Sequence, residues 1–341
     1  MKNSRIYSTC SLVLVFLFAL GVPCSGTTAE TSSPKKVLVV HSYHETQKEH
    51  VVEMTMGIRK ALEKSNTLIE FFHMDTKRKN SVQWKREAGR MAERLMNSFQ
   101  PDIVITMDDN AQDYFARKHA GKKGAPVFVF GGVNAKPEKY GFPAENVTGV
   151  IERPNILESI TFLQKIVPGV EKMVMIADKS PTTDQFCQYA KGLDLPVEVI
   201  AYEQPRTFAQ WKAVITRYQT RADAFGIYVI RTIERGNGDK THVPEKELMD
   251  FMLEHSTLPM TGFFDTAAKA GILCGVAVSM REQGFAAGKI ANQILNGASV
   301  SDFTVQPTTR GRIMLNLKTA EKLGIKDIPW RIISRAGEVV K

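Results

Sequence analysis

Ser42, Tyr43 and His44 place a hydroxyl, a phenol and an imidazole close to the end of an apolar run that begins at Val37. These groups donate and accept hydrogen bonds, and the run itself is typical of a buried strand. No hydrophobic pattern requires polar and aromatic side chains at this position. The segment is therefore the strongest candidate in the sequence for contact with a small polar molecule.

Polar residues also follow other apolar runs of the chain. In open α/β sheets, ligands bind beyond the carboxyl ends of the strands, where loops and helix N-termini present unpaired N–H groups. An arginine or a helix N-terminus there would suit a carboxylate and an aspartate would suit an amine, so the solute would be amphoteric or carboxylated. The further candidates are Asp108, Asp109, Asn110, Gly132, Asn134, Asp178, Ser180, Thr182, Thr183, Arg231 and Asp265.

Each candidate also has a purely structural interpretation. An aspartate beside the start of a helix most often caps it, which is the alternative role of Asp108 and Asp109. Thr182 and Thr183 could do the same for a later helix, and Gly132 could supply only a tight turn. The loops as a set are therefore a firmer prediction than any single residue.

No residue pattern indicates a metal site, a cofactor or an enzyme. His41 and His44 flank one loop, but no cysteine or acidic partner completes a zinc spacing. A G-x-S-x-G motif is missing, and Gly284–Lys289 is one residue short of a phosphate loop, so we interpret it as a small-residue helix face packed on a sheet. The net charge of +9 is spread along the chain without a basic stripe, so we expect no nucleic-acid binding.

The first 29 residues have the features of an export signal. Lys2 and Arg5 precede an uncharged apolar run over residues 12–22, about half of the roughly 20 residues that a transmembrane helix needs. Small residues favour cleavage after Ala29, and lipid modification of Cys24 is the less favoured alternative. We therefore expect residues 1–29 to be a signal peptide and the mature protein to be periplasmic or extracellular.

Two cysteines, Cys187 and Cys274, lie beyond the export segment. An oxidising compartment would allow them to pair, but the pattern around Cys187 predicts a helix and that around Cys274 a buried strand. We expect two buried free thiols.

Short β-branched runs alternate with amphipathic stretches through most of the chain. Continuous apolar strands are those that helices bury on both faces, and the alternation predicts parallel sheets with right-handed crossovers. The pattern restarts near Thr148–Pro154 without a Gly/Ser-rich linker, and the length fits two domains. The sequence therefore predicts an α/β protein with two doubly wound, Rossmann-like lobes and a ligand cleft between them.

The restart of the pattern also predicts where the chain passes between lobes. We expect crossings near residues 149–152, 257–265 and 305–312. Lobe one then comprises residues 30–150 and 266–308, and lobe two comprises residues 151–265 and 309–341.

Four groups of segments occur in the order found in a known family. They are Val37–His44 with Gly57-Ile58, Phe130–Asn134 with Asn146–Val150, Gln283–Gly288 with Ile294–Gly297, and Asn316–Ala320 with Leu323–Ile325. With these segments the chain resembles the type I periplasmic binding proteins, and within them the ABC-transporter substrate-binding proteins that include tryptophan/tyrosine-type binders. The resemblance covers most of residues 35–330. It implies a monomeric binding protein, not an enzyme, that delivers a small polar or aromatic, amino-acid-like solute to a membrane permease.

A second resemblance leaves an alternative open. His41–His44 and Met74–Arg78 are similar to segments of periplasmic sensor domains that precede histidine kinases or cyclases and share this fold. The alternative function is therefore a ligand-sensing subunit of a signalling system. Because no output domain follows, we favour a free-standing binding protein.

Overall fold

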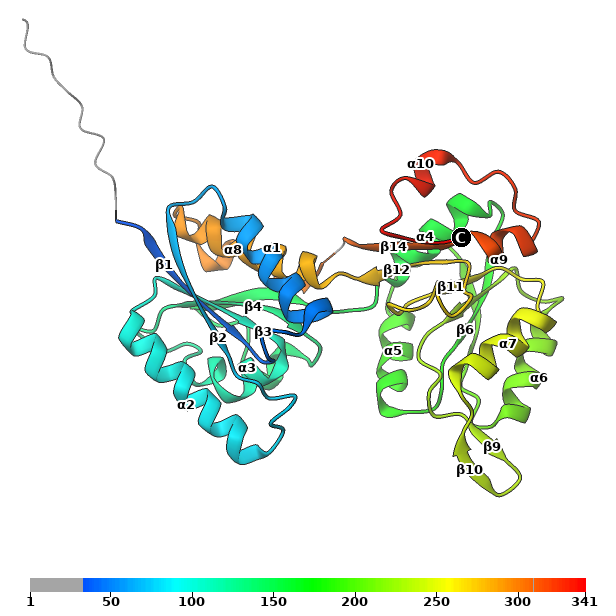
Figure 1. Cartoon of the computed structure of the whole chain (residues 1–341), viewed down its shortest axis with the longest axis horizontal. Helices are drawn as coiled ribbons and strands as arrows, with labels where there is room; N and C mark the ends of the chain where they lie inside the picture. The colour runs from blue at the N-terminus through cyan, green and yellow to red at the C-terminus, as the bar shows by residue number, and fades with distance from the viewer. Residues whose placement is uncertain (1–32, 309) are drawn as a thin grey trace, which may run out of the picture. The chain divides into compact units, whose positions relative to one another are not determined.

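A six-stranded parallel sheet organises the first lobe of the computed structural model, which describes residues 33–308 and 310–341 (Figure 1). The expected signal peptide lies outside these residues. The strand order is β13-β5-β4-β3-β1-β2. The strands are β1 (Lys35–His41), β2 (Thr67–His73), β3 (Ile103–Met107), β4 (Val127–Val133), β5 (Val147–Ile151) and β13 (Gln306–Pro307).

Helices cover both faces of this sheet, which explains why its central strands are apolar without alternation. On one face, α1 and α8 pack against Val37, Val39 and Ile105, and on the other α2 and α3 pack against Leu38 and Val104. The helical segments are a π-helical turn η1 (Lys48–Val52), α1 (Glu53–Leu62), α2 (Val82–Phe99), α3 (Asp108–Tyr114), α8 (Met280–Leu295) and the 3₁₀ turns η2 (Ala116–Lys118), η3 (Pro137–Tyr140) and η4 (Val300–Asp302).

A seven-stranded sheet organises the second lobe, in the order β15-β14-β12-β11-β8-β6-β7. Its strand pairs are parallel except β12 with β14, which is antiparallel. The strands are β6 (Lys172–Ile176), β7 (Glu198–Glu203), β8 (Ala224–Ile227), β11 (Met260–Gly262), β12 (Cys274–Val278), β14 (Gly311–Asn316) and β15 (Glu338–Val340).

Helices also cover both faces of the second sheet. On one face α6 and α7 bury Trp211 and Met249, and on the other α4 and α5 bury Ile160 and Phe186. The elements are α4 (Ile156–Ile166), α5 (Pro181–Lys191), α6 (Phe208–Tyr218), α7 (Glu245–His255), α9 (Leu317–Lys322), α10 (Trp330–Ile333) and the hairpin β9 (Glu234–Gly236) with β10 (Asp239–His242).

The predicted fold class, two doubly wound α/β lobes, is confirmed. One boundary is wrong: the second crossing does not lie at residues 257–265, because β11 and β12 are neighbouring strands of one sheet. Residues 266–278 therefore belong to lobe two, and the chain returns to lobe one only between β12 and α8. The strand before the predicted crossing, β11, has only three residues but lies in the middle of the sheet, between β8 and β12. The next buried run along the chain, β12, therefore continues the same sheet.

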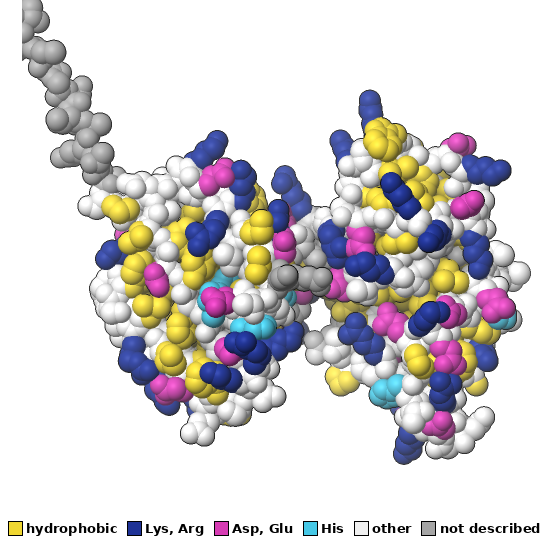
Figure 2. All heavy atoms as spheres, in the orientation of Figure 1, with side chains coloured by type: hydrophobic (Ala, Val, Ile, Leu, Met, Phe, Trp, Pro, Cys, Tyr) yellow, Lys and Arg dark blue, Asp and Glu magenta, His cyan; other side chains and the backbone are white. Residues whose placement is uncertain are grey.

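The remaining general features concern thiols and surface. Cys187 in α5 and Cys274 in β12 are both buried and unpaired, as expected. On the face shown in Figure 2, lysine and arginine side chains are interspersed with acidic ones over both lobes. Among the described residues, no helix is long and apolar enough to span a bilayer.

Candidate functional site

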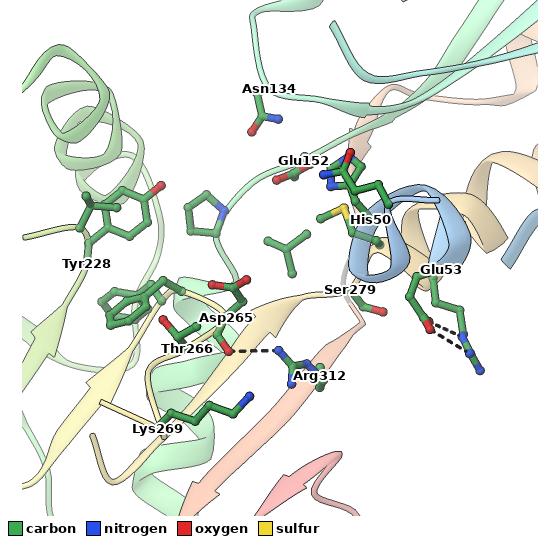
Figure 3. A pocket seen from close by; sticks show the side chains of 18 of the residues that line it. His50, Glu53, Asn134, Glu152, Tyr228, Asp265, Thr266, Lys269, Ser279 and Arg312 are labelled. Atoms are coloured by element: carbon green, nitrogen blue, oxygen red, sulfur yellow. Dashed lines mark hydrogen bonds and ion pairs between the residues drawn. The ribbon is translucent and has the colours of Figure 1, made fainter. Parts of the chain in front are cut away.

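A cavity of about 860 Å³ lies between side chains of the two lobes and of the segments that connect them (Figure 3). Its volume falls within the roughly 300–1,000 Å³ of small-molecule sites. Lobe one contributes Gln47, His50, Glu53, Lys77, Asn134, Met280 and Arg281. The connecting segments and lobe two contribute Glu152, Pro154, Ser279, Tyr228, Val229, Phe263, Phe264, Asp265, Thr266, Lys269, Val278 and Arg312.

Two acidic groups, Glu152 and Asp108, lie at the lobe-one end of the cavity. Glu152 follows the last residue of β5, and Asp108 follows the last residue of β3, so both lie at the carboxyl edge of the sheet. His50 Nε2 lies 2.5 Å from Asp108 Oδ1. Asp108 Oδ2 and Glu152 Oε2 are buried and have no hydrogen-bond partner in the structure. Asp108 also has a φ of 64°, a left-handed conformation that is strained for a residue with a side chain.

This burial perturbs the ionisation of the wall. Burial, with the nearby charge of Asp108, raises the pKa of Glu152 to about 7. Burial also raises the pKa of Asp108, although its hydrogen bond to His50 opposes the change. Burial lowers the pKa of His50, but the hydrogen bond and charge of Asp108 outweigh it, so that the net shift is upward. Perturbed groups that converge on a cavity are characteristic of functional sites.

Basic side chains predominate on the opposite part of the wall. Arg312, in β14, forms an ion pair with Glu338 and donates from Nη2 to the carbonyl of Asp265 at 3.0 Å. Lys269 lies 3.4 Å from the same Glu338 carboxylate. Asp265 also lines this part of the cavity, so the two cations lie near two carboxylates. The guanidinium of Arg312 still offers charged N–H donors to an anionic group of a solute.

Aromatic side chains form the lobe-two flank. Tyr228 follows β8 and stacks on Phe186 with ring centroids 4.1 Å apart, and Phe186 contacts Phe263 at 5.6 Å. Phe263 is itself 2% exposed, so the rings are held by the core of lobe two. The flank therefore offers a fixed apolar surface with one phenol.

Two of the residues predicted from the sequence, Asn134 and Asp265, line the cavity directly. Asp108 lies behind His50 and is bound to it. Tyr43 packs on the His50 ring, with centroids 5.2 Å apart. The structure thus brings these four candidates to the site or to its supporting layer.

Other lobe-one candidates hold their loops in place. Ser42 Oγ donates to the Met107 carbonyl and accepts from the Ala111 amide, so Ser42, and not an aspartate, satisfies the start of α3. Asp109 accepts from two backbone amides and from the Tyr140 hydroxyl. The remaining three do not line the cavity: Asn110 donates to Thr76, Gly132 donates to Gln283, and His44 is half-buried.

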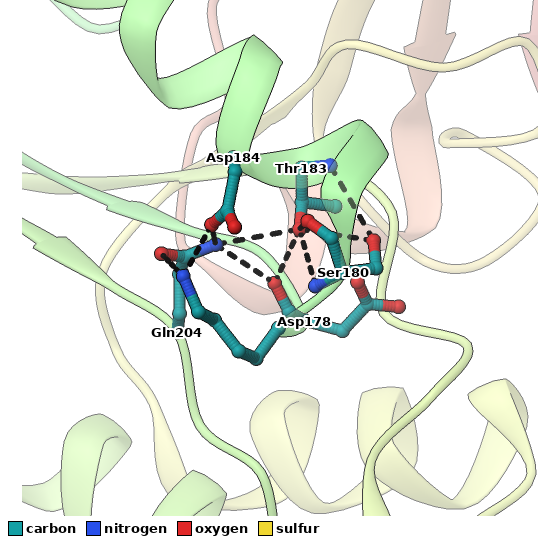
Figure 4. Close-up of polar contacts among 6 residues, drawn as sticks. Asp178, Ser180, Thr183, Asp184 and Gln204 are labelled. Carbon is teal, nitrogen blue, oxygen red and sulfur yellow. Dashed lines mark hydrogen bonds and ion pairs between the residues drawn. The ribbon is translucent and has the colours of Figure 1, made fainter.

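Three of the other lobe-two candidates, Asp178, Ser180 and Thr183, hold a loop in place by hydrogen bonds (Figure 4). Asp178 Oδ2 accepts from the backbone amides of Arg231 and Thr232 at 2.8 and 3.0 Å. Ser180 caps α5 together with Thr183 in a capping box. Thr182 is exposed. The Arg231 side chain is 65% exposed, lies 3.7 Å from Glu245 and does not line the cavity.

Sequence reasoning missed the residues that dominate the cavity. Glu152 and Tyr228 directly follow strands, and the rule that predicted the other candidates could have found them. His50 lies in the π-helical turn η1 and Arg312 on the antiparallel strand β14, and no sequence signal marks either one.

Comparison with known proteins assigns a family. Residues 44–340 match the family model described as ABC transporter substrate binding protein. A ligand-free, open substrate binding protein with adhesive properties from Clostridium difficile superposes with a TM-score of 0.63 at 16% identity, covering 90% of this chain and 99% of that one. An ABC domain from Streptococcus pneumonia in complex with L-Trp gives a TM-score of 0.46 at 20% identity, with coverage of 90% and 100%. No curated protein matches the chain.

Proposed function

Since the chain belongs to the ABC transporter substrate-binding protein family, we propose that it binds a small amphoteric, amino-acid-like solute in the cavity lined by both lobes. The observation that carries the proposal is the distribution of charge in this cavity. The Glu152 carboxylate, with Asp108 behind His50, lies on one part, and Arg312 with Lys269 lies on another. An ammonium group and a carboxylate on one solute would neutralise both.

The chemistry of each contact follows from the groups present. A solute ammonium group donates up to three hydrogen bonds, and the carboxylate of Glu152, which lines the cavity, would accept one. A solute carboxylate would accept from the guanidinium of Arg312, whose planar fork suits two parallel bonds. An apolar or aromatic side chain of the solute would pack on Tyr228, at the favourable distances of ring pairs.

Binding would also couple the two lobes. Glu152, directly after the lobe-one strand β5, supplies the acidic contact, and lobe two supplies the basic and aromatic contacts. A solute therefore makes all of its contacts only when the two lobes close around it. Its binding energy then favours the closed arrangement over an open one. In the proposed pathway the exported protein presents the closed complex to a membrane permease. The alternative partner, a separate signalling receptor, would use the same cavity.

A thermal-shift screen with calorimetry tests the proposal. The mature protein, from residue 30, is mixed with the standard L-amino acids and with analogues that lack either the amine or the carboxylate. An amphoteric solute at 100 times its Kd should stabilise the fold by about 2.7 kcal/mol, and both analogues should bind more weakly.

Two tyrosine variants supply the control for this screen. Tyr228→Ala should weaken binding, whereas Tyr189→Ala should not, because Tyr189 is a half-buried tyrosine of lobe two that does not line the cavity. The proposal would be contradicted if only the analogues without an amine stabilised the protein, or if the two tyrosine variants changed the binding affinity equally.

A further inference from the structure

Three titratable groups meet where the carboxyl ends of β3 and β5 approach η1. His50 is bonded to one oxygen of Asp108, and the other Asp108 oxygen and Glu152 Oε2 remain without partners. An isolated buried carboxylate is costly unless it is paired or protonated. The cluster therefore has more acidic groups than its own hydrogen bonds can satisfy.

Neighbouring elements offset this surplus only in part, through the charge of Lys77 near Asp108 and a hydrogen bond from Asn134 to Glu152. Asp109, beside Asp108 in α3, adds negative charge, and its oxygens already accept from Asn134, Ala135 and Tyr140. Lys77, from the loop after β2, lines the cavity, and its Nζ lies 5.5 Å from the centre of the Tyr43 ring. From lobe two, Tyr228 faces Glu152 as a neutral phenol, because burial raises its pKa above the ordinary value.

We propose that Glu152 holds a proton while the site is empty and exchanges that proton for the cationic group of the solute. This inference rests on the proposed function, in that it assumes a solute with an ammonium group. In the exchange the O–H bond of the Glu152 carboxylic acid breaks, its proton passes to solvent, and the carboxylate accepts a hydrogen bond from the ammonium group. One positive charge enters the site as one leaves, so the net charge of the buried cluster does not change.

The exchange predicts a pH dependence with a definite sign. Burial raises the pKa of the empty-site Glu152 to about 7, and a bound cation lowers it again because it favours the carboxylate. Below pH 7 the proton competes with the cation, so affinity should fall about tenfold for each unit of pH. Above pH 7 this competition by the Glu152 proton ends. Deprotonation of His50 at higher pH leaves the Asp108 charge uncompensated, which would favour a cation further.

Carboxyl NMR tests the exchange without a known solute. The mature protein is labelled with ¹³C at its glutamate carboxyl carbons and titrated with and without methylammonium chloride, the ammonium group alone, using sodium chloride to match ionic strength. Glu152→Gln identifies the resonance, and Glu254→Gln, on the exposed surface of α7, should remove a different one. We expect one glutamate to titrate near pH 7, to be missing in Glu152→Gln, and to move to a lower midpoint with methylammonium.

The outcomes separate this inference from the proposed function. An ordinary midpoint for Glu152, or one that methylammonium leaves unchanged, would overturn the exchange. If the NMR result is as expected but no amino acid binds in the screen, the exchange stands and the amphoteric solute class is wrong. Melting curves of Glu152→Gln serve as the folding check, since glutamine has the shape of a protonated glutamate.

Discussion

Replacing Gly284 of α8 by alanine should destabilise lobe one. A Cβ on Gly284 would lie 2.0 Å from the carbonyl oxygen of Met54 in α1, where ordinary contact begins at 3.4 Å. The obstructing atoms belong to the backbone, so no side-chain rotation relieves the overlap, and the helices must separate by more than an ångström. Overpacking typically costs about 1–3 kcal/mol, and alanine regains about 0.5–1 kcal/mol as the better helix former. The two ranges leave a net loss of up to about 2.5 kcal/mol, and the overlap with backbone atoms places the expected value in the upper part of this range.

Urea denaturation of the mature protein measures this loss as a lower midpoint. The matched control is Gly192→Ala at the C-cap of α5, where φ is −88° and the nearest atom to a new Cβ lies 3.5 Å away. There alanine should be neutral or stabilise by up to about 1 kcal/mol, mainly by restricting the unfolded chain. Equal midpoints for the two variants would refute the inferred close approach of α1 and α8.

Three further predictions concern the site, its supporting loop and export. Arg312→Ala should weaken solute binding by about 1.5–3 kcal/mol, one to two decades in Kd, whereas Arg231→Ala, at an exposed side chain outside the cavity, should leave calorimetric affinity unchanged. Asp178→Ala should lower the free energy of unfolding by about 1–3 kcal/mol because two backbone amides lose their buried acceptor, and unchanged melting would contradict this. N-terminal sequencing of the exported protein should begin at Glu30, and a lipid-modified cysteine would show a different cleavage.

Much of the fold could be predicted because its strands are buried on both faces. β1 and β3 are continuous apolar runs, and this pattern is strong enough to identify a parallel sheet from sequence. The second crossing could not be placed because β11 has three residues and ends near a glycine, which looks like the end of a sheet. The small-residue face of α8 packs on the sheet through Ala287, as expected, but Gly284 of the same face contacts α1.

From the sequence, the candidate site could be placed at the carboxyl edge of the sheet, but most of its individual residues could not be identified. Polar residues gather at strand ends for two reasons, to bind ligands and to hold their own loops, and Asp178 shows the second. Residue type does not distinguish these roles, because both require hydrogen-bonding groups. Arg312 reaches the cavity because β14 pairs antiparallel with β12. Nothing in the sequence of either segment indicates that the two strands pair.

A crystal structure of the complex with the solute that the screen identifies tests the central claim most directly. The proposed binding mode predicts that the ammonium group lies within hydrogen-bond distance of Glu152 and the carboxylate within that distance of Arg312, with the solute side chain against Tyr228. A solute bound outside this cavity, or one inside it with its carboxylate directed at Glu152, would contradict the account.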